Sequence, residues 1–323
     1  MEKALVKSAP PNRELGPLLK FADTAREFIS QAKAANTKRA YRADWEHFTA
    51  WCNSHCLAFM PAAVQTVVLY LSDLAAARKT STLTRRVSAI SQAHQLAGHE
   101  SPTRNAAVHS VMAGIRRIKG TAPEVKTAAI VDDIRSMVAT LPAGPIGSRD
   151  RALLLVGFAG AFRRSELVGL NREDVEFVRE GLVITLRRSK TDQEGHGRKV
   201  AIPYGSNPDT CPVRALQAWL DVASIASGPL FRSINRYGRI HPRRLCDRTV
   251  ALVVKRYAAA CGKDARQFAG HSLRAGLATS AAIAGASERS IMNQTGHRST
   301  AMVRRYIRDG SLFRDNAASN IGL

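Results

Sequence analysis

A tyrosine with two arginines directly before it lies near the C-terminal end of the sequence, in GHRSTAMVRRYI (296–307). Tyr306 follows His297 by nine positions. On one continuous α-helix that step turns the chain by roughly 900°, which would put the two side chains on opposite faces. Ser299 and Thr300 are residue types that begin helices, so we expect a loop histidine that folds back toward a tyrosine on the next helix. A phenol, with a pKa of about 10, becomes a competent nucleophile where surrounding positive charge favours phenolate.

A second histidine lies upstream, in GHSLRAG (270–276). His271 and Arg274 are three residues apart, so both side chains would project to one side of a helix start. Arginine presents a permanent, planar fork of donors that can hold two oxygens of a phosphate. Histidine can share or transfer a proton near neutral pH. The pair therefore indicates chemistry at a phosphoryl centre.

Two further cationic candidates stand in the middle of the chain. GAFRRSEL (160–167) offers Arg163 or Arg164, and RRSKTD (187–192) offers Lys190 in an expected hairpin. Each motif alone is weak evidence, because such cations are ordinarily solvated surface charges. Their order carries more information: Arg-x-Ser-Glu, a hairpin lysine, His-x-x-Arg, Gly-His and then a tyrosine.

The elements that must position these residues begin with a helical half. Apolar residues recur every three to four positions within four stretches: 36–52, 61–77, 80–98 and 103–120. We expect Asn36 or Thr37 to cap the first helix. Basic residues are expected on the exposed faces of these helices and at their end: Lys38, Arg39, Arg42, Arg85, Arg86 and Lys119. Gly and Pro near 120–123 indicate a linker.

The second half mixes helices with strands. Helices are expected around 130–139 and 148–160, and the pattern then alternates as in strands over 175–178, 182–187 and 198–202. We expect these strands to form a small antiparallel sheet, after which helices resume. The predicted fold class is mainly α with a small antiparallel β-sheet.

Composition points to a polyanionic partner. The 323 residues suffice for about two domains. Lys and Arg number 48 against 26 acidic residues, a formal net charge of +22 that is spread over both halves, so nucleic acid is the leading candidate.

No apolar run reaches the roughly 18 residues of a membrane span, and the N-terminus lacks a signal-peptide stretch, so we expect an intracellular protein. The five cysteines are expected to be reduced thiols, with no metal site.

The ordered motif series resembles the tyrosine recombinase (phage integrase) family, in particular Cre/Xer-like site-specific recombinases. The resemblance covers most of the chain, and NTKRAYRADWEHFTAWC (36–52) is similar to the first signature region of the family. It implies a two-domain architecture with an α+β catalytic domain. The expected divisions are an irregular N-terminal arm (1–18), a helical core-binding domain (19–119), a linker (120–128) and the catalytic domain with its C-terminal tail (129–323).

The resemblance also implies roles for the upstream residues. Arg163 matches the first arginine of the family because it precedes x-Ser-Glu, and Glu166 looks like the supporting acid that orients basic groups. Lys190 is similar to the hairpin lysine that protonates the departing 5′ oxygen, and Lys199 is the fallback.

The downstream residues complete the implied active site. His271 and Arg274 match the His-x-x-Arg pair, His297 matches a position held by histidine or tryptophan, and Tyr306 matches the nucleophile. The implied reaction cleaves and rejoins DNA through a 3′-phosphotyrosyl intermediate, without a metal, ATP or any other cofactor.

The implied partner is double-stranded DNA carrying specific recombination sites, bound by a homotetramer in the cytoplasm. In the family, a C-terminal segment often docks into the neighbouring protomer. Further contacts to the phosphate backbone are expected from Arg239, Arg243 and Arg244 in the catalytic half, beside the basic residues of the helical half.

Two alternatives use the same features differently. A type IB topoisomerase-like enzyme would apply much the same phosphate chemistry to single duplexes, and relaxation without exchange between paired sites would distinguish it. A non-catalytic basic DNA-binding protein would bind DNA without forming a covalent adduct.

Overall fold

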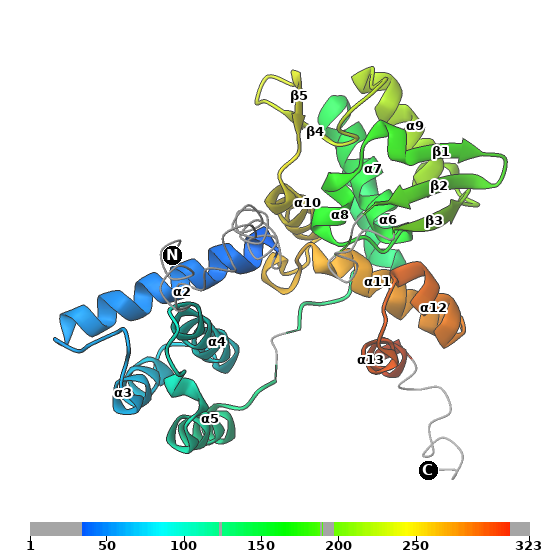
Figure 1. The fold of residues 1–323 in the computed structure, drawn as a ribbon. Coiled ribbons are helices and arrows are strands. Elements are labelled where there is room, and N and C mark those ends of the chain that lie inside the picture. Colours follow the sequence, from blue (N-terminus) through cyan, green and yellow to red (C-terminus); the bar gives the residue numbers. More distant parts are fainter. Residues whose placement is uncertain (1–33, 123–124, 188, 190–196, 311–323) are drawn as a thin grey trace, which may run out of the picture. The chain divides into compact units, whose positions relative to one another are not determined.

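The structure, a computed structural model, describes residues 34–122, 125–187, 189 and 197–310. The chain divides into two compact units, Met1–Glu124 and Val125–Leu323 (Figure 1). Within the described ranges, no helix combines the length and the apolar character that crossing a membrane would need.

The described part of the first unit is helical. It contains α2 (Ala35–Ser54), α3 (Val64–Ala75), α4 (Thr80–Leu96) and α5 (Ala106–Lys119), with a 3₁₀ turn at Pro102–Arg104. All four stretches of the first unit that were predicted to be helical therefore form helices. The predicted cap is wrong, because α2 already begins at Ala35 and no described side chain caps its first turn.

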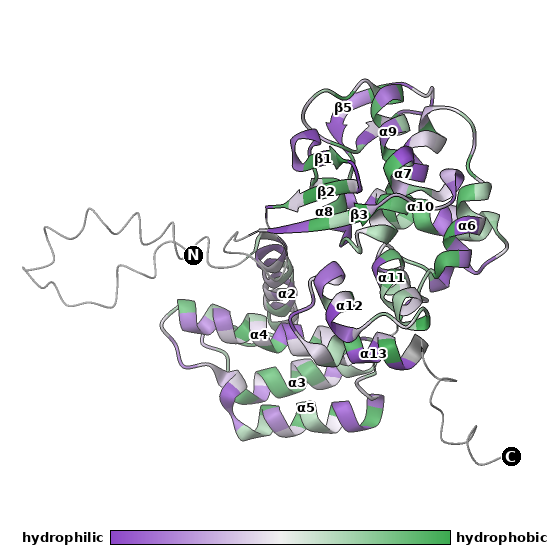
Figure 2. Cartoon of the chain, turned by 90° about the vertical axis from the view of Figure 1, so that its right-hand side faces the viewer, coloured by the Kyte–Doolittle hydropathy of each residue, from purple (hydrophilic) through white to green (hydrophobic). Residues whose placement is uncertain are grey.

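An aromatic cluster forms the core of the first unit. Phe48 and Cys52, one turn apart on α2, are fully buried, and Tyr70 of α3 is buried against them. The rings of Phe48 and Tyr70 meet edge to face with 5.0 Å between centroids. Figure 2 shows hydrophobic and hydrophilic residues alternating around α3, α4 and α5, as expected for helices with one buried side.

Both arginines of α4 were expected to be exposed, but only one of them is. Arg86 is only 6% exposed, and its Nη1 donates to the Tyr70 hydroxyl (2.9 Å). It lies three residues after Leu83 and four before Ile90, both fully buried, and so falls on the apolar stripe of the helix. The expectation of an exposed Arg86 is therefore wrong.

Two other cations in this unit are engaged in internal contacts. Arg85 is exposed, but it donates two hydrogen bonds to the buried carboxylate of Asp44 (2.6 and 3.0 Å). The ammonium of Lys119 donates to the carbonyls of Ala75 and Arg78. The Ala75 carbonyl is at the last residue of α3, so Lys119 caps that helix and also binds the bend that follows it at Arg78.

The second unit contains the predicted small sheet. Strands β1 (Val175–Val178), β2 (Gly181–Leu186) and β3 (Arg198–Pro203) form an antiparallel sheet in that order. The sheet buries one side of β3 and leaves Lys199, Ala201 and Pro203 of that strand exposed. A second antiparallel pair joins β4 (Arg232–Ile234) to β5 (Ile240–Arg244). The sheet predicted from the alternating pattern is confirmed.

The remaining elements of the second unit are helices. They are α6 (Val131–Ala139), α7 (Pro145–Ala159), α8 (Arg164–Gly169), α9 (Pro212–Ala223), α10 (Asp247–Ala260), α11 (His271–Ile283), α12 (Glu288–Thr295) and α13 (Thr300–Gly310). Short 3₁₀ turns occur at Arg172–Asp174, Pro208–Thr210 and Ala265–Gln267.

The core of this unit is built around α7, which runs through its middle in Figure 1. Every residue from Ala152 to Val156 is buried, and a helix that is apolar all round must be covered on every side. Trp219 of α9 is fully buried beside it and donates its indole N–H to the Leu230 carbonyl (2.8 Å). This packed centre gives the surrounding helices and strands a rigid support.

Candidate active site

Helix α11 carries two of the predicted residues, and the backbone before α6 holds it in place. Ser272 is fully buried, and its carbonyl accepts the backbone N–H of Ala129 (3.0 Å). At Gly276 an added Cβ would lie 1.8 Å from the Ala129 carbonyl oxygen, so only glycine permits this approach. His271 and Arg274 therefore lie on the first turns of a firmly docked helix.

Arg274 is a buried cation with one nitrogen left over. Its side chain is 1% exposed, and Nη1 donates to the Ala161 carbonyl (2.7 Å). Nη2 is buried and has no hydrogen-bond partner among the residues that the structure describes. Burial, and then the positive charge of Arg163, lower the pKa of Arg274 to about 10. An unpartnered buried guanidinium nitrogen is costly, so this group is suited to receive an anion.

Arg163 and Glu166 form an ion pair at the start of α8. The Glu166 carboxylate accepts the backbone N–H of Arg163 (2.9 Å) and also its Nη1 (2.5 Å). The side chain of Glu166 is 2% exposed and that of Arg163 is 20% exposed. The charges of both residues influence the pKa of Arg274, so the pair lies in the same electrostatic environment. Glu166 thus orients Arg163 from its buried side while part of the arginine stays open.

Tyr306 lies on α13 and meets the histidine of α11. Its hydroxyl is 3.0 Å from Nε2 of His271, within hydrogen-bond distance. Tyr306 is 8% exposed and Val303, one turn earlier, is fully buried, and both pack against small residues of α11 such as Ala278. Figure 1 shows α11, α12 and α13 following one another, from orange to red, at the C-terminal end of the unit. The contact brings together residues that are 35 positions apart.

His297 lies in the loop between α12 and α13, as its nine-residue separation from Tyr306 predicted. Its ring centroid is 5.9 Å from that of Tyr306. Nδ1 is 2.8 Å from the hydroxyl of Thr295, which is itself buried and donates to the Ile291 carbonyl (2.6 Å). Since that hydroxyl hydrogen is already used, its oxygen accepts the Nδ1 hydrogen and leaves the lone pair of neutral His297 on Nε2.

The charge around His297 opposes its protonation. Burial is the largest influence, followed by the positive charges of Arg274 and Arg163, and together with His271 and Arg198 they lower its pKa to about 4. At neutral pH the protein therefore holds His297 uncharged. An anion placed among these arginines would reverse that balance.

Two family models match the chain, and the first of them covers every predicted residue of the site described above. Residues 130–311 match the phage integrase family, and residues 26–101 match the phage integrase N-terminal SAM-like domain. The chain belongs to the phage integrase family.

The relatives of this integrase-family protein are recombinases. An integrase/recombinase XerD homolog of Selenomonas ruminantium is 43% identical over 301 residues, covering 92% of this chain and 88% of that one. Tyrosine recombinase XerC of Herpetosiphon aurantiacus is 28% identical over 295 residues, covering 86% of each chain. The protein is thus a tyrosine recombinase, and the topoisomerase-like and non-catalytic alternatives are not favoured.

Solved integrase-family structures have the same fold. XerH site-specific recombinase bound to a palindromic difH substrate, in a post-cleavage complex, superposes with a TM-score of 0.61 at 16% identity and covers 80% of this chain and 72% of that one. A lambda integrase dimer bound to a COC′ core site gives a TM-score of 0.58 at 14% identity and covers 94% and 83%.

Not every predicted residue of the recombinase site can be located. Lys190 lies outside the described residues. Its fallback, Lys199, is exposed on β3. Successive side chains of a strand point to opposite faces, so Lys199 points away from the face that carries Val200 and Ile202, both buried.

One cation beside the predicted site residues was not identified from the sequence. Arg198 begins β3 and lies close enough to Arg274 and His297 to lower the pKa of both. A signal was available, because the alternation of the strand puts Arg198 on the same face as Val200 and Ile202. The basic run around it made the residue look like an ordinary surface cation.

The predicted DNA-contacting residues fall into two groups. Those exposed in the structure are Lys38, Arg39, Arg42, Arg239 and Arg243. Those already engaged in internal contacts are Arg85, Arg86, Lys119 and Arg244. Arg244 donates to the carbonyls of Val168 and Leu170 and thereby fastens β5 to the end of α8.

Proposed function

We propose that this recombinase cleaves and rejoins DNA at specific sites through a covalent bond to Tyr306. One observation carries the proposal: Nη2 of Arg274 is buried and unpartnered among the described residues, in a site where the Tyr306 hydroxyl already meets His271. A phosphodiester oxygen is an anionic acceptor that would satisfy that nitrogen.

The proposed cleavage step accounts for each bond that forms or breaks and for each proton that moves. The Tyr306 oxygen attacks the phosphorus and its proton passes to Nε2 of His271, which lies 3.0 Å away. The bond from phosphorus to the 5′ oxygen breaks, and that oxygen takes a proton from Lys190, the role that the family resemblance implies. The products are a 3′-phosphotyrosyl bond and a free 5′-hydroxyl. A 5′-hydroxyl from another strand reverses the step and restores the backbone.

The charge that gathers on the phosphate oxygens is met by fixed donors. Arg163, held by Glu166, and Arg274, held by the Ala161 carbonyl, would each donate to a non-bridging oxygen. His297 would donate from Nε2 once the phosphate has raised its pKa. Because these donors are already oriented, little reorganisation is needed when the reaction occurs.

Covalent capture from a pool of candidate sites tests this proposal. A library of nicked duplexes with randomised cores is incubated with the protein. The protein is then denatured with detergent, and the DNA that remains attached to it is sequenced. We expect wild type to retain a defined set of sequences and Tyr306→Phe to retain none. A covalent product of equal yield from Tyr306→Phe would refute the assignment of the nucleophile.

The partner is proposed to be duplex DNA, contacted by both units in the cytoplasm. The solved relatives bound to DNA and the net charge of +22 support this partner. We propose that the exposed cations bind the phosphate backbone: Lys38, Arg39, Arg42, Arg239 and Arg243. The helical unit would serve as a core-binding domain and the second unit as the catalytic domain.

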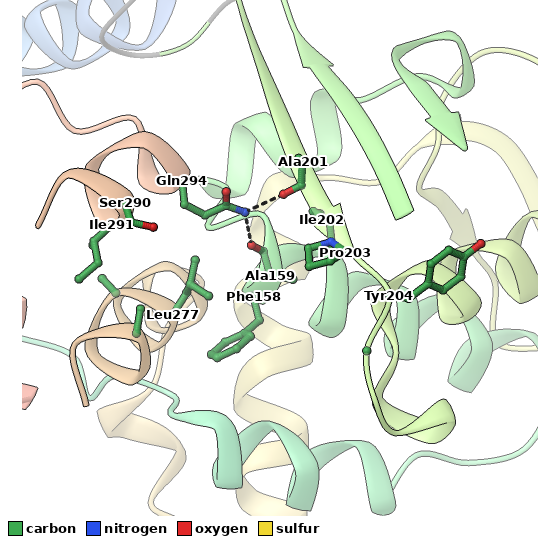
Figure 3. A pocket seen from close by; sticks show the side chains of 13 residues that line it. Phe158, Ala159, Ala201, Ile202, Pro203, Tyr204, Leu277, Ser290, Ile291 and Gln294 are labelled. Carbon is green, nitrogen blue, oxygen red and sulfur yellow. Dashed lines mark hydrogen bonds between the residues drawn. The ribbon is translucent and has the colours of Figure 1, made fainter. Parts of the chain in front are cut away.

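A tetramer on paired sites is also part of the proposal. An open, largely apolar cavity of about 350 Å³ lies between α7, β3, α11 and α12 (Figure 3). We propose that residues 311–323 of a neighbouring protomer, which include Leu312 and Phe313, fill it. Deleting these residues should leave protomers that bind DNA but do not sediment as tetramers. Tetramers of undiminished stability would contradict this part of the proposal.

A further inference from the structure

Arg198 lies where a strand meets the end of a helix. It is the first residue of β3, and its side chain shares a face with two buried residues of that strand, Val200 and Ile202. Burial is the main reason that its pKa is lowered from the ordinary value of arginine, with the nearby Arg163 contributing. A cation in such a position must be held by fixed acceptors.

The acceptors are the last carbonyls of α12. Nη1 of Arg198 donates to Asn293 and Gln294 (both 3.2 Å), and Nη2 lies 3.5 Å from the carbonyl of Thr295. These carbonyls have no partners within the helix, and a cation is favourable at the negative end of a helix. Arg198 therefore closes α12 as a side-chain cap supplied by a strand about 95 residues earlier in the chain.

The guanidinium also rests against the turn that leads to His297. α12 ends at Thr295 and is followed by Gly296, whose φ of 66° and ψ of 34° are left-handed. A Cβ at this position would lie 2.8 Å from Nε and 2.9 Å from Cζ of Arg198. Glycine is thus required twice, for the left-handed conformation and for the space that the guanidinium occupies. Gly296 directly precedes His297, so this contact lies next to the histidine in the chain.

A second, neutral side chain fastens the same helix. The amide nitrogen of Gln294 donates to the carbonyls of Ala159 (2.7 Å) and Ala201 (3.1 Å), shown as dashed lines in Figure 3. These bonds attach α12 to α7 and to the middle of β3. They do not touch Gly296, so Gln294 provides a matched control for general loosening of the helix.

We propose that Arg198 is a positioning residue that sets the place of His297 beside the scissile phosphate by holding the end of α12 and Gly296. This inference rests on the proposed function, since it concerns the same reaction. Arg198 is not expected to bind the phosphate itself, because its terminal nitrogens already face the three carbonyls. Its charge adds to the field that keeps His297 neutral before DNA binds.

A double-mutant cycle tests the inference. Single-turnover cleavage is measured at saturating protein, on a nicked duplex recovered by covalent capture, for Arg198→Met, Arg198→Lys, His297→Ala and the two double variants. A misplacement of about 1 Å can cost roughly 100-fold in rate, so we expect Arg198→Met to slow adduct formation by at least about tenfold. In the His297→Ala background we expect either Arg198 change to alter the rate by less than about twofold.

The controls separate positioning from other effects. Gln294→Met should lower the melting temperature but show little coupling to His297→Ala. Arg198→Lys keeps the charge without the planar fork, so its loss should be smaller than that of Arg198→Met and should also vanish without the histidine. Equal losses in both backgrounds would overturn the inference, as would coupling as strong for Gln294→Met as for Arg198→Met. If wild type itself forms no adduct, the proposed function fails instead.

Discussion

Binding of DNA should place a proton on His297. The buried Thr295 hydroxyl donates to the Ile291 carbonyl and accepts from Nδ1 of His297, so neutral His297 carries no hydrogen on Nε2. Donation from Nε2 to a phosphate oxygen therefore requires the imidazolium form. In the free protein, burial and then the charge of Arg274 lower the pKa of His297 to about 4, and the phosphate anion would act in the opposite direction.

The size of the effect follows from the two pKa values. A return from about 4 to the ordinary value near 6.5 corresponds to about 3 kcal/mol of interaction with the phosphate. At pH 6 the free protein would be about 1% protonated at this site and the complex about 75%, so each bound site should take up about 0.75 proton. At pH 7 the uptake should fall to about 0.25 proton. Binding should accordingly be favoured as the pH falls from about 7 toward 5.

Calorimetry in two buffers of different ionisation enthalpy measures this proton uptake directly. The Tyr306→Phe background removes any heat from cleavage, and a duplex recovered by covalent capture serves as ligand. His297→Gln should abolish most of the uptake. His99→Gln, which changes an exposed histidine of the first unit, should not. Unchanged uptake in His297→Gln, or no uptake in the parent, would refute the reasoning.

Four further outcomes are expected. Glu166→Gln removes a buried carboxylate that holds a partly buried guanidinium, so urea denaturation should reveal a loss of about 3 kcal/mol, and wild-type stability would contradict the ion-pair assignment. Arg39→Gln should weaken DNA binding and lower the slope of log affinity against log salt by about 1. Arg86→Met should lower the melting temperature and leave that slope unchanged, because its side chain is buried, and a reduced slope would restore it as a DNA contact. Thr295→Val removes the acceptor that fixes the tautomer of His297, so single-turnover cleavage should slow, and an unchanged rate would show that the tautomer is immaterial.

The sequence predicts those features whose cause is local. The helices of the first unit follow from apolar residues at helical spacing, and the three-stranded sheet follows from alternation along 175–202. The loop position of His297 follows from helix geometry alone, because a nine-residue step cannot keep two side chains on one face. The start of α2 at Ala35 was not predicted, because Asn36 and Thr37 are typical capping residues but lie inside the helix, which has Ala34 at its N-cap.

The features that the sequence does not predict depend on partners far along the chain. Arg198 finds its acceptors on α12, and Arg244 finds its acceptors beside α8. Each looks like a surface cation until the fold supplies these carbonyls. Arg86 is a different case, since its place between Leu83 and Ile90 was visible in the helical period, but its charge favoured the exposed interpretation.

The most direct test of the account is to find the atom of the protein to which DNA becomes attached. The captured adduct is digested with nuclease and protease, and the modified peptide is sequenced by mass spectrometry while the released DNA end is labelled. The account predicts a nucleotide joined through its 3′ phosphate to Tyr306, together with a free 5′-hydroxyl on the other fragment. Attachment to any other residue, or a linkage through a 5′ phosphate, would contradict it.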